Sequence, residues 1–162
     1  PAVEKGVLEG MERGPMAGSP VVDLRVILYD GSTHPVDSSD IAFQAAAQGA
    51  FKQVYMKAKP QILEPIMKVS VEGPSEFAGN VFATISQRRG VIVSSVEDGL
   101  FARVEAEVPL SEMFGYSSVL RSLTQGKAEF TMEFLKYGRV PPQIAALLME
   151  QHLEKQRKGS PK

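Results

Sequence analysis

The clearest alternation of hydrophobic and polar positions lies in the second half of the chain. Over Leu100–Val108 every second residue is apolar and most of the others are charged, which is the period of a strand with one buried face. An apolar run over Val91–Val96 precedes it, and the Asp98-Gly99 pair between the two runs is typical of a hairpin turn. The pattern therefore predicts two antiparallel strands joined by a tight turn.

Two further strands and two helices flank this hairpin. Apolar positions recur with strand spacing over residues 63–71 and 128–134, and Gly73-Pro74 ends the first of these runs. Helical spacing predicts one helix that Ser75 caps and Gly90 ends, and a second over residues 111–123. The order strand, helix, strand, strand, helix, strand is the split βαβ of a ferredoxin-like α+β sandwich.

The first sixty residues contain two helical patterns and one strand pattern. Apolar residues at helical spacing cover positions 3–11 and end at Gly14-Pro15, and a second apolar stripe covers positions 43–55. Between them, residues 22–28 alternate as a strand does. Because one strand cannot satisfy its own backbone donors and acceptors, partner strands must come from elsewhere. With no initial Met, the chain is expected to be the C-terminal piece of a longer protein.

A polar loop over residues 29–39 joins the predicted strand to the second helix. The Asp30-Gly31 pair suits a turn in which the glycine has positive φ, and Asp37 or Ser38 can cap the helix that follows. His34, one of two histidines in the chain, is thereby presented to solvent. Exposed loops on a rigid frame often carry function, so His34 is the first candidate for a functional residue.

Composition excludes several kinds of protein. A net charge of −1 over 162 residues argues against a surface that binds nucleic acid as a whole, so any RNA contact must be local. The absence of cysteine rules out disulfides and thiolate metal sites, and His34 and His152 show no metal-ligand spacing. No apolar run is long enough to predict a membrane span. No nucleophile elbow or G-x-x-x-x-G-K-[ST] phosphate loop occurs, so we expect no catalytic activity from this chain.

Several segments resemble those of the elongation factor G family, in the family's order and spacing across nearly the whole chain. They are Pro1–Gly6, Leu28–Ser39, Leu63–Val69, Phe114–Tyr116, Leu120–Ser122, Thr124–Gly126 and Phe130–Phe134.

The resemblance implies a domain organisation. Residues 1–60 would be the second half of the family's fourth domain, an incomplete α/β half-domain resembling the ribosomal protein S5 second-domain-like fold. Residues 61–138 would be the ferredoxin-like fifth domain. Residues 139–162 would form a helix that Pro141-Pro142 opens and that packs back on the fourth domain. Its inward residues are expected to be Ile144, Leu147 and Leu148. A basic, frayed tail is expected to contain Lys155, Arg157, Lys158 and Lys162.

The family is a ribosomal translocase driven by GTP hydrolysis, so the resemblance also implies partners. They are the ribosome, tRNA, mRNA and the missing N-terminal domains of the parent protein, with no membrane. GTP and Mg²⁺ would bind in those N-terminal domains, and no cofactor or metal is expected in this chain. A bacterial cytoplasm is the expected location, with the mitochondrial matrix as the alternative.

The resemblance places ribosome-contacting residues in two groups. The tip loop would enter the decoding region with Asp30, Gly31, Ser32, Thr33 and His34. An imidazole can donate or accept hydrogen bonds and can stack on exposed bases.

The second group lies in the fifth domain. Arg88 and Arg89 would contact large-subunit ribosomal RNA near the stalk base, and the alternative is a solvated pair that stabilises a helix C-terminus. Phe114 and Tyr116 are expected to be packing residues, and the alternative for them is a platform on which bases stack. In the tip loop, Pro35 departs from the family pattern, stiffening the loop and removing a backbone donor.

Three alternatives to a translocation factor stay open. A paralogue acting in ribosome recycling would keep the architecture but need not keep the Asp30-Gly31-Ser32 and His34 residues. A stand-alone RNA-binding module is the second. The third is a small enzyme using His34 as a base, which requires a pocket with a second polar group beside the ring.

Overall fold

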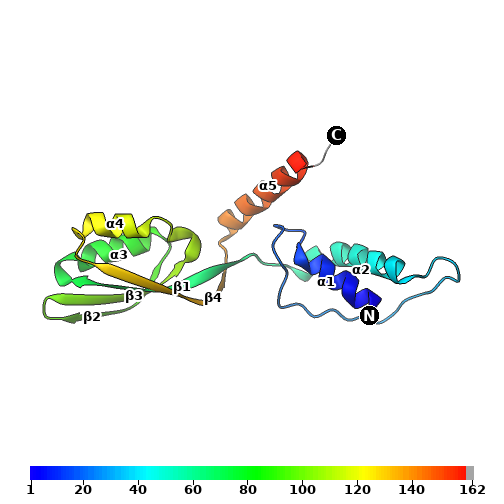
Figure 1. Cartoon of the computed structure of the whole chain (residues 1–162), viewed down its shortest axis with the longest axis horizontal. Helices are drawn as coiled ribbons and strands as arrows, with labels where there is room; N and C mark the ends of the chain where they lie inside the picture. Colours follow the sequence, from blue (N-terminus) through cyan, green and yellow to red (C-terminus); the bar gives the residue numbers. More distant parts are fainter. Residues whose placement is uncertain (160–162) are drawn as a thin grey trace. The chain divides into compact units, whose positions relative to one another are not determined.

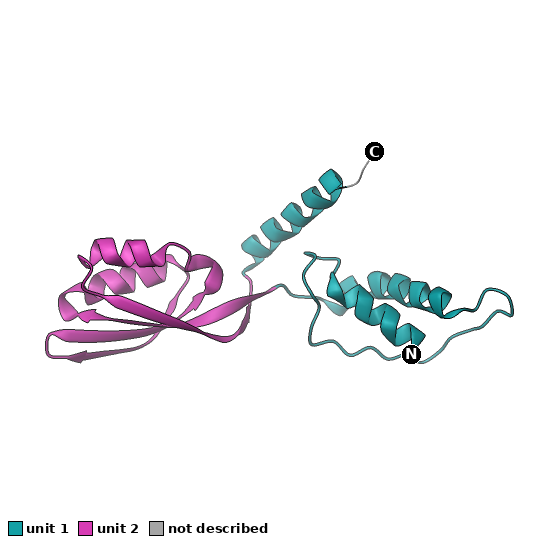
Figure 2. Ribbon diagram, viewed as in Figure 1, with its two compact units in different colours: residues 1–62, 141–162 teal, residues 63–140 magenta. Residues whose placement is uncertain are grey.

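The structure is a computed structural model that describes residues 1–159 and divides into two compact units (Figure 1, Figure 2). One unit consists of residues 1–62 and the residues from 141 onward, and the other consists of residues 63–140. Each unit is described separately below. Within residues 1–159, no helix combines the length and apolar character needed to cross a bilayer.

Residues 63–140 form the predicted ferredoxin-like sandwich. Its elements are β1 (Leu63–Pro74), α3 (Ala78–Gln87), β2 (Val91–Asp98), β3 (Phe101–Pro109), α4 (Tyr116–Leu123) and β4 (Glu129–Arg139). The strands lie in the order β2-β3-β1-β4 and all neighbours are antiparallel. Both helices cover the same face of this sheet (Figure 1). The split βαβ arrangement predicted from the sequence is confirmed.

The alternation in β3 decides which face of the sheet is buried. Its apolar positions face the helices, whereas Arg103, Glu105 and Glu107 lie between them on the other face. The core joins this face to β1 and to both helices through Val69, Val71, Val81, Ile85, Val104, Ala106, Val108, Tyr116 and Leu120. Each large apolar side chain buried in this way contributes about 1.5 to 3 kcal/mol of transfer free energy.

Both helices of this unit begin later than the sequence predicted. Ser75–Phe77 form a 3₁₀ turn ahead of α3, and the Ser75 side chain makes no capping hydrogen bond. Leu110–Glu112 form a second 3₁₀ turn, and α4 begins only after Gly115, whose φ is 75°. A left-handed glycine interrupts a right-handed helix, so the helix predicted over residues 111–123 is wrong in its first part.

Burial of Tyr116 contributes stability to the fold that is lost at alkaline pH. Desolvation raises the pKa of this phenol above its usual 10, against smaller opposing effects of Thr84 and Arg88. The neutral form is therefore favoured in the folded state, and this contribution is complete below pH 10. It is lost as the pH rises from 10 through the folded pKa, because only the unfolded chain gains from ionisation.

Tyr116→Phe is accordingly expected to lose less stability than the wild type between pH 9 and pH 11. Urea unfolding of both proteins at the two pH values measures this difference. Tyr137→Phe, which changes an exposed ring in the same unit, is the matched control. Equal losses in the wild type and Tyr116→Phe would contradict the prediction.

The described residues of the other unit form three helices and a short 3₁₀ turn. They are α1 (Ala2–Glu12), α2 (Asp40–Tyr55), the turn Met56–Ala58 and α5 (Pro142–Gly159). α1 packs on α2, and a β-carbon at Gly6 would lie 2.4 Å from the carbonyl oxygen of Gln44. Glycine is therefore required where the two backbones meet, and Phe51 and Tyr55 are buried along the same face of α2. Both predicted helices of the first sixty residues are confirmed.

The strand predicted over residues 22–28 is wrong. These residues have no regular secondary structure, and their apolar side chains are exposed at Val22, Leu24, Val26 and Leu28. The physical reason is the lack of a partner strand, which the sequence already indicated. Residues 1–62 contribute no second strand, so the backbone of this segment has no ladder to join.

α5 begins where the two prolines predicted it, but its apolar side is not buried. Of the three residues expected to point inward, Ile144 is half-buried, Leu147 and Leu148 are exposed, and no residue of the helix is fully buried. The described part of its unit contains no sheet that could cover it. Of the predicted basic tail, Lys155, Arg157 and Lys158 lie within the helix, and Lys162 lies outside the described residues.

Candidate functional site

The loop over residues 29–39 is exposed and is supported by its own polar side chains. The carboxylate of Asp30 accepts a hydrogen bond from the N–H of Gly31 at 2.7 Å, and the Ser38 hydroxyl accepts one from the N–H of His34 at 2.7 Å. The Ser39 hydroxyl accepts a hydrogen bond from the N–H of Ala42 at 3.2 Å. Ser39 therefore caps α2, instead of the predicted Asp37 or Ser38.

Gly31 does not need to be a glycine for conformational reasons. Its φ is not in the left-handed region, contrary to the prediction, and a β-carbon there would have no neighbour within 4 Å. The structure has no turn at Asp30-Gly31, and the side chain of Asp30 accepts the N–H of Gly31 within an irregular stretch of the loop.

The His34 ring is held through one nitrogen and otherwise left open. Its Nδ1 lies 3.3 Å from a carboxylate oxygen of Asp37 and 3.4 Å from the N–H of Val36. A protonated Nδ1 donates to the carboxylate, whereas an unprotonated Nδ1 accepts from the backbone, so either form keeps the ring in place. The side chain is 65% exposed.

A shallow, open hollow of about 350 Å³ lies beside this ring. The loop and the first turns of α2 line it with Ser32, Thr33, His34, Asp37, Ser38, Ala42, Phe43 and Ala46. The enzyme alternative required such a pocket with a second polar group, and Asp37 is that group. Among residues 1–159, the contacts of the imidazole are to Asp37 and to the N–H of Val36, and no hydroxyl is hydrogen-bonded to the ring.

The chemistry of the loop suits bases and sugars better than phosphates. Asp37 beside the imidazole and Asp30 earlier in the loop are carboxylates that repel a phosphate group, whereas Ser32, Thr33 and the ring offer hydrogen-bond donors and acceptors. Such groups can bond to base edges and ribose hydroxyls of an unpaired nucleic acid strand.

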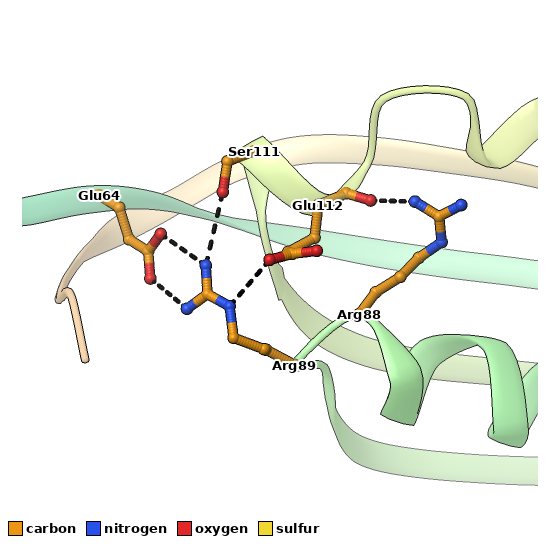
Figure 3. Close-up of polar contacts among 5 residues, drawn as sticks. All are labelled: Glu64, Arg88, Arg89, Ser111 and Glu112. Atoms are coloured by element: carbon orange, nitrogen blue, oxygen red, sulfur yellow. Dashed lines mark hydrogen bonds and ion pairs between the residues drawn. The ribbon is translucent and has the colours of Figure 1, made fainter. Parts of the chain in front are cut away.

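Arg89 is engaged within the fold (Figure 3). It donates two parallel hydrogen bonds to Glu64 at 2.8 and 2.9 Å, and its Nε donates to Glu112 at 3.0 Å. The hydrogen bond to Glu64 is the main cause that raises the pKa of Arg89, with Glu112 adding to it and burial opposing it. The three side chains together carry one negative charge, so this arginine presents no net positive charge to a phosphate.

Arg88 is engaged on the other side of the same turn. Its guanidinium donates to the carbonyl oxygen of Glu112 and to that of Phe114, the latter at 3.3 Å, and it lies 5.1 Å from the centroid of the Tyr116 ring. Neither arginine is therefore the solvated helix end that was the alternative to RNA contact.

The sequence missed these partners because they are distant along the chain. Glu64 and Glu112 are 25 and 23 residues away from Arg89, and no short-range spacing signals the pairing. Tyr116 packs in the core as predicted, but Phe114 does not, since it is 78% exposed. Among residues 1–159, no three His, Cys, Asp or Glu side chains are grouped so that they could hold a metal ion.

Comparison with known proteins identifies the family. Residues 1–59 match the model for elongation factor G, domain IV, and residues 61–148 match the model for the elongation factor G C-terminus. Elongation factor G 1 of Borreliella burgdorferi is 64% identical over 144 residues, 89% of this chain and 21% of that protein. Elongation factor G 1 of Treponema pallidum is 58% identical over 157 residues, 97% of this chain and 23% of that protein.

A crystal structure of a protein from Thermus thermophilus matches with a TM-score of 0.83 and 42% identity, over 94% of this chain and 23% of that one. The chain thus spans about a fifth of the length of the relatives it matches. Two family models that together cover residues 1–148 in the family's own order show that this chain belongs to the elongation factor G family.

Proposed function

We propose that this chain is the ribosome-contacting C-terminal part of a translation elongation factor that promotes GTP-dependent translocation of tRNA and mRNA. The supporting observation is the match of both units to consecutive parts of elongation factor G, at up to 64% identity. The parent protein would be a translational GTPase of the bacterial cytoplasm. GTP and Mg²⁺ would bind in its N-terminal domains, because these 162 residues contain no phosphate loop.

The tip loop is the part that we assign to the decoding region. Its open imidazole, its hydroxyls at Ser32 and Thr33 and its flanking carboxylates favour contact with bases and sugars of tRNA or mRNA over contact with phosphates. The unit of residues 63–140 would contact large-subunit ribosomal RNA, at the surface where Arg88 and Arg89 lie. Retention of Asp30-Gly31-Ser32 and His34 favours translocation over recycling.

His34→Ala in the full-length factor is expected to slow translocation about tenfold, which corresponds to roughly 1.4 kcal/mol from one lost polar contact in the transition state. Ribosome-stimulated GTP hydrolysis should stay within twofold, because the phosphate-binding machinery lies outside this chain. Rapid-kinetic assays of mRNA movement and of phosphate release measure the two rates.

His152→Ala is the matched control, because it removes the only other imidazole, which lies on α5. It should change neither rate. Unaltered translocation in His34→Ala would overturn the role proposed for the tip loop, and an equal loss of GTP hydrolysis would point to a general defect.

A further inference from the structure

The ring of His34 makes its polar contacts within residues 1–159 through one nitrogen. Nδ1 lies 3.3 Å from a carboxylate oxygen of Asp37 and 3.4 Å from the backbone N–H of Val36. Nε2 makes no hydrogen bond within the same residues, and the side chain is exposed. Nε2 is therefore the atom through which the ring can bond to a partner, and its protonation decides whether that partner must be a donor or an acceptor.

The turn before α2 brings Asp37 back to this ring. Residues 35–37 form a turn that begins with Pro35, whose own ring fixes its backbone φ. The Ser38 hydroxyl accepts the N–H of His34 at 2.7 Å, so the backbone of His34 is tied to the residue that follows Asp37. Because the loop is already closed on both sides of the turn, little conformational entropy is lost when the carboxylate meets the imidazole.

The two groups at Nδ1 favour different protonation states of the ring. The carboxylate of Asp37 accepts a hydrogen bond and requires a proton on Nδ1, whereas the N–H of Val36 requires a bare Nδ1. The contact with the carboxylate is the shorter one, and a hydrogen bond to a charged group is about twice as strong as a neutral one. In the neutral ring the proton is therefore held on Nδ1, and Nε2 is a hydrogen-bond acceptor.

We propose that Asp37 is a positioning residue that holds the proton of the neutral His34 ring on Nδ1, so that Nε2 accepts a hydrogen bond from tRNA or mRNA. The proposal rests on the proposed function of the tip loop. The donor in the RNA is a ribose 2′-hydroxyl or the exocyclic amino group of a base, because a phosphodiester carries no proton to donate. The open hollow beside the ring gives such a group access.

The position of the proton is measured in the 162-residue chain, without the ribosome. Two-bond ¹⁵N–¹H correlation spectra in alkaline buffer, where histidine rings are neutral, should show the His34 ring protonated on Nδ1. Asp37→Ala should move the proton to Nε2 in most molecules, because only the N–H of Val36 then remains at Nδ1. Asp30→Ala is the control, since Asp30 has the same charge but bonds to the N–H of Gly31, and its ring should match the wild type.

Two results of these spectra would overturn the positioning role while leaving the proposed function intact. They are a wild-type ring that is protonated on Nε2, and a ring whose protonation is the same in Asp37→Ala as in the wild type.

Pro35→Ala tests the turn in the same spectra. The fraction of rings protonated on Nε2 should rise part of the way toward that of Asp37→Ala, because a freer turn keeps the carboxylate beside the ring for less of the time. An unchanged fraction would show that the proline has no part in holding Asp37.

Asp37→Ala in the full-length factor should slow translocation about fivefold, less than the roughly tenfold expected for His34→Ala, because the ring still adopts the acceptor form in a minority of molecules. Ribosome-stimulated GTP hydrolysis should be unchanged. The variant with both substitutions should be no slower than His34→Ala alone, since Asp37 acts only through the ring.

Two outcomes of the kinetics separate the two proposals. A further loss in the double variant would give Asp37 a contact of its own and overturn its role as a positioning residue. If Asp37→Ala moves the proton as expected but all three variants translocate at the wild-type rate, the proposed function of the tip loop fails instead.

The two possible donors are distinguished with RNA that carries 2′-deoxyribose in the codon or in the anticodon loop. If the wild-type factor slows on such RNA to the rate of His34→Ala, and His34→Ala slows no further, the donor is a 2′-hydroxyl. If the wild type keeps its advantage over His34→Ala on both RNAs, the donor is an amino group of a base.

Discussion

Gly90→Ala is expected to destabilise residues 63–140 by about 3 kcal/mol, a large part of the stability of a domain of this size. Gly90 follows α3, and a β-carbon there would lie 2.4 Å from Cγ2 of Ile85, 2.8 Å from the carbonyl oxygen of Ile85 and 2.9 Å from Cγ2 of Val108. That carbonyl oxygen accepts the N–H of Gly90 at 2.9 Å, so it cannot move away without breaking the hydrogen bond that ends the helix.

A glycine inside α3 provides the control. A β-carbon at Gly79 would have no neighbour within 4 Å, so Gly79→Ala should gain up to about 1 kcal/mol from helix propensity. Urea unfolding followed by circular dichroism compares both variants with the wild type. The same chemical change should therefore shift the midpoint in opposite directions, and an unchanged midpoint in Gly90→Ala would contradict the close approach described here.

Tyr116→Ala is expected to lose about 3 to 5 kcal/mol, the range found when a large buried side chain is truncated. The ring is 1% exposed and meets Phe130 edge to face, with 5.0 Å between ring centroids. Its hydroxyl lies 3.3 Å from that of Thr84, and Arg88 lies over its face. Truncation would leave a cavity and remove all three contacts at once.

Phe114→Ala is the matched control for this substitution, because it removes a ring two residues away that is exposed to solvent. It should change the unfolding free energy by less than about 0.5 kcal/mol. Chemical unfolding at neutral pH separates the two predictions clearly. A loss in Tyr116→Ala as small as the one expected for Phe114→Ala would show that Tyr116 is not a core residue.

The fold of residues 63–140 could be predicted because its information is local. The alternation in β3 fixes a buried face, and glycine or proline near each boundary fixes the order of elements, without reference to distant residues. The helix predicted over residues 111–123 failed at Gly115, where the backbone conformation interrupts an otherwise helical apolar pattern.

The strand expected over residues 22–28 failed for a different reason. Alternation indicates which side chains a strand would bury, but a strand exists only when another backbone pairs with it. The sequence of this segment is consistent with strand formation, and the described residues of its unit contain no strand to pair with it.

The candidate site was predictable in its position and not in its detail. Polar turn residues correctly placed an exposed loop around His34, but the choice of Ser39 as the helix cap depends on backbone angles that the sequence does not specify. Arg88 and Arg89 were predicted from the sequence as candidate RNA contacts. The ion pairs of Arg89 with Glu64 and Glu112 could not be predicted, because only the folded sheet brings these residues together. Phe114 and Tyr116 have similar side chains and opposite environments, a difference that follows from the turn at Gly115.

The pairing of the first strand of residues 63–140 with the last has a consequence for how the protein is made. β1 lies at the centre of the sheet, between β3 and β4, and its partner β4 is the final strand of the unit. During synthesis from the N-terminus, the backbone groups on one edge of β1 therefore stay unpaired until Glu129–Arg139 have left the ribosome. Such long-range pairing slows folding, so the nascent chain passes through a three-stranded stage with an open central edge, which is the stage at which chaperones are most needed.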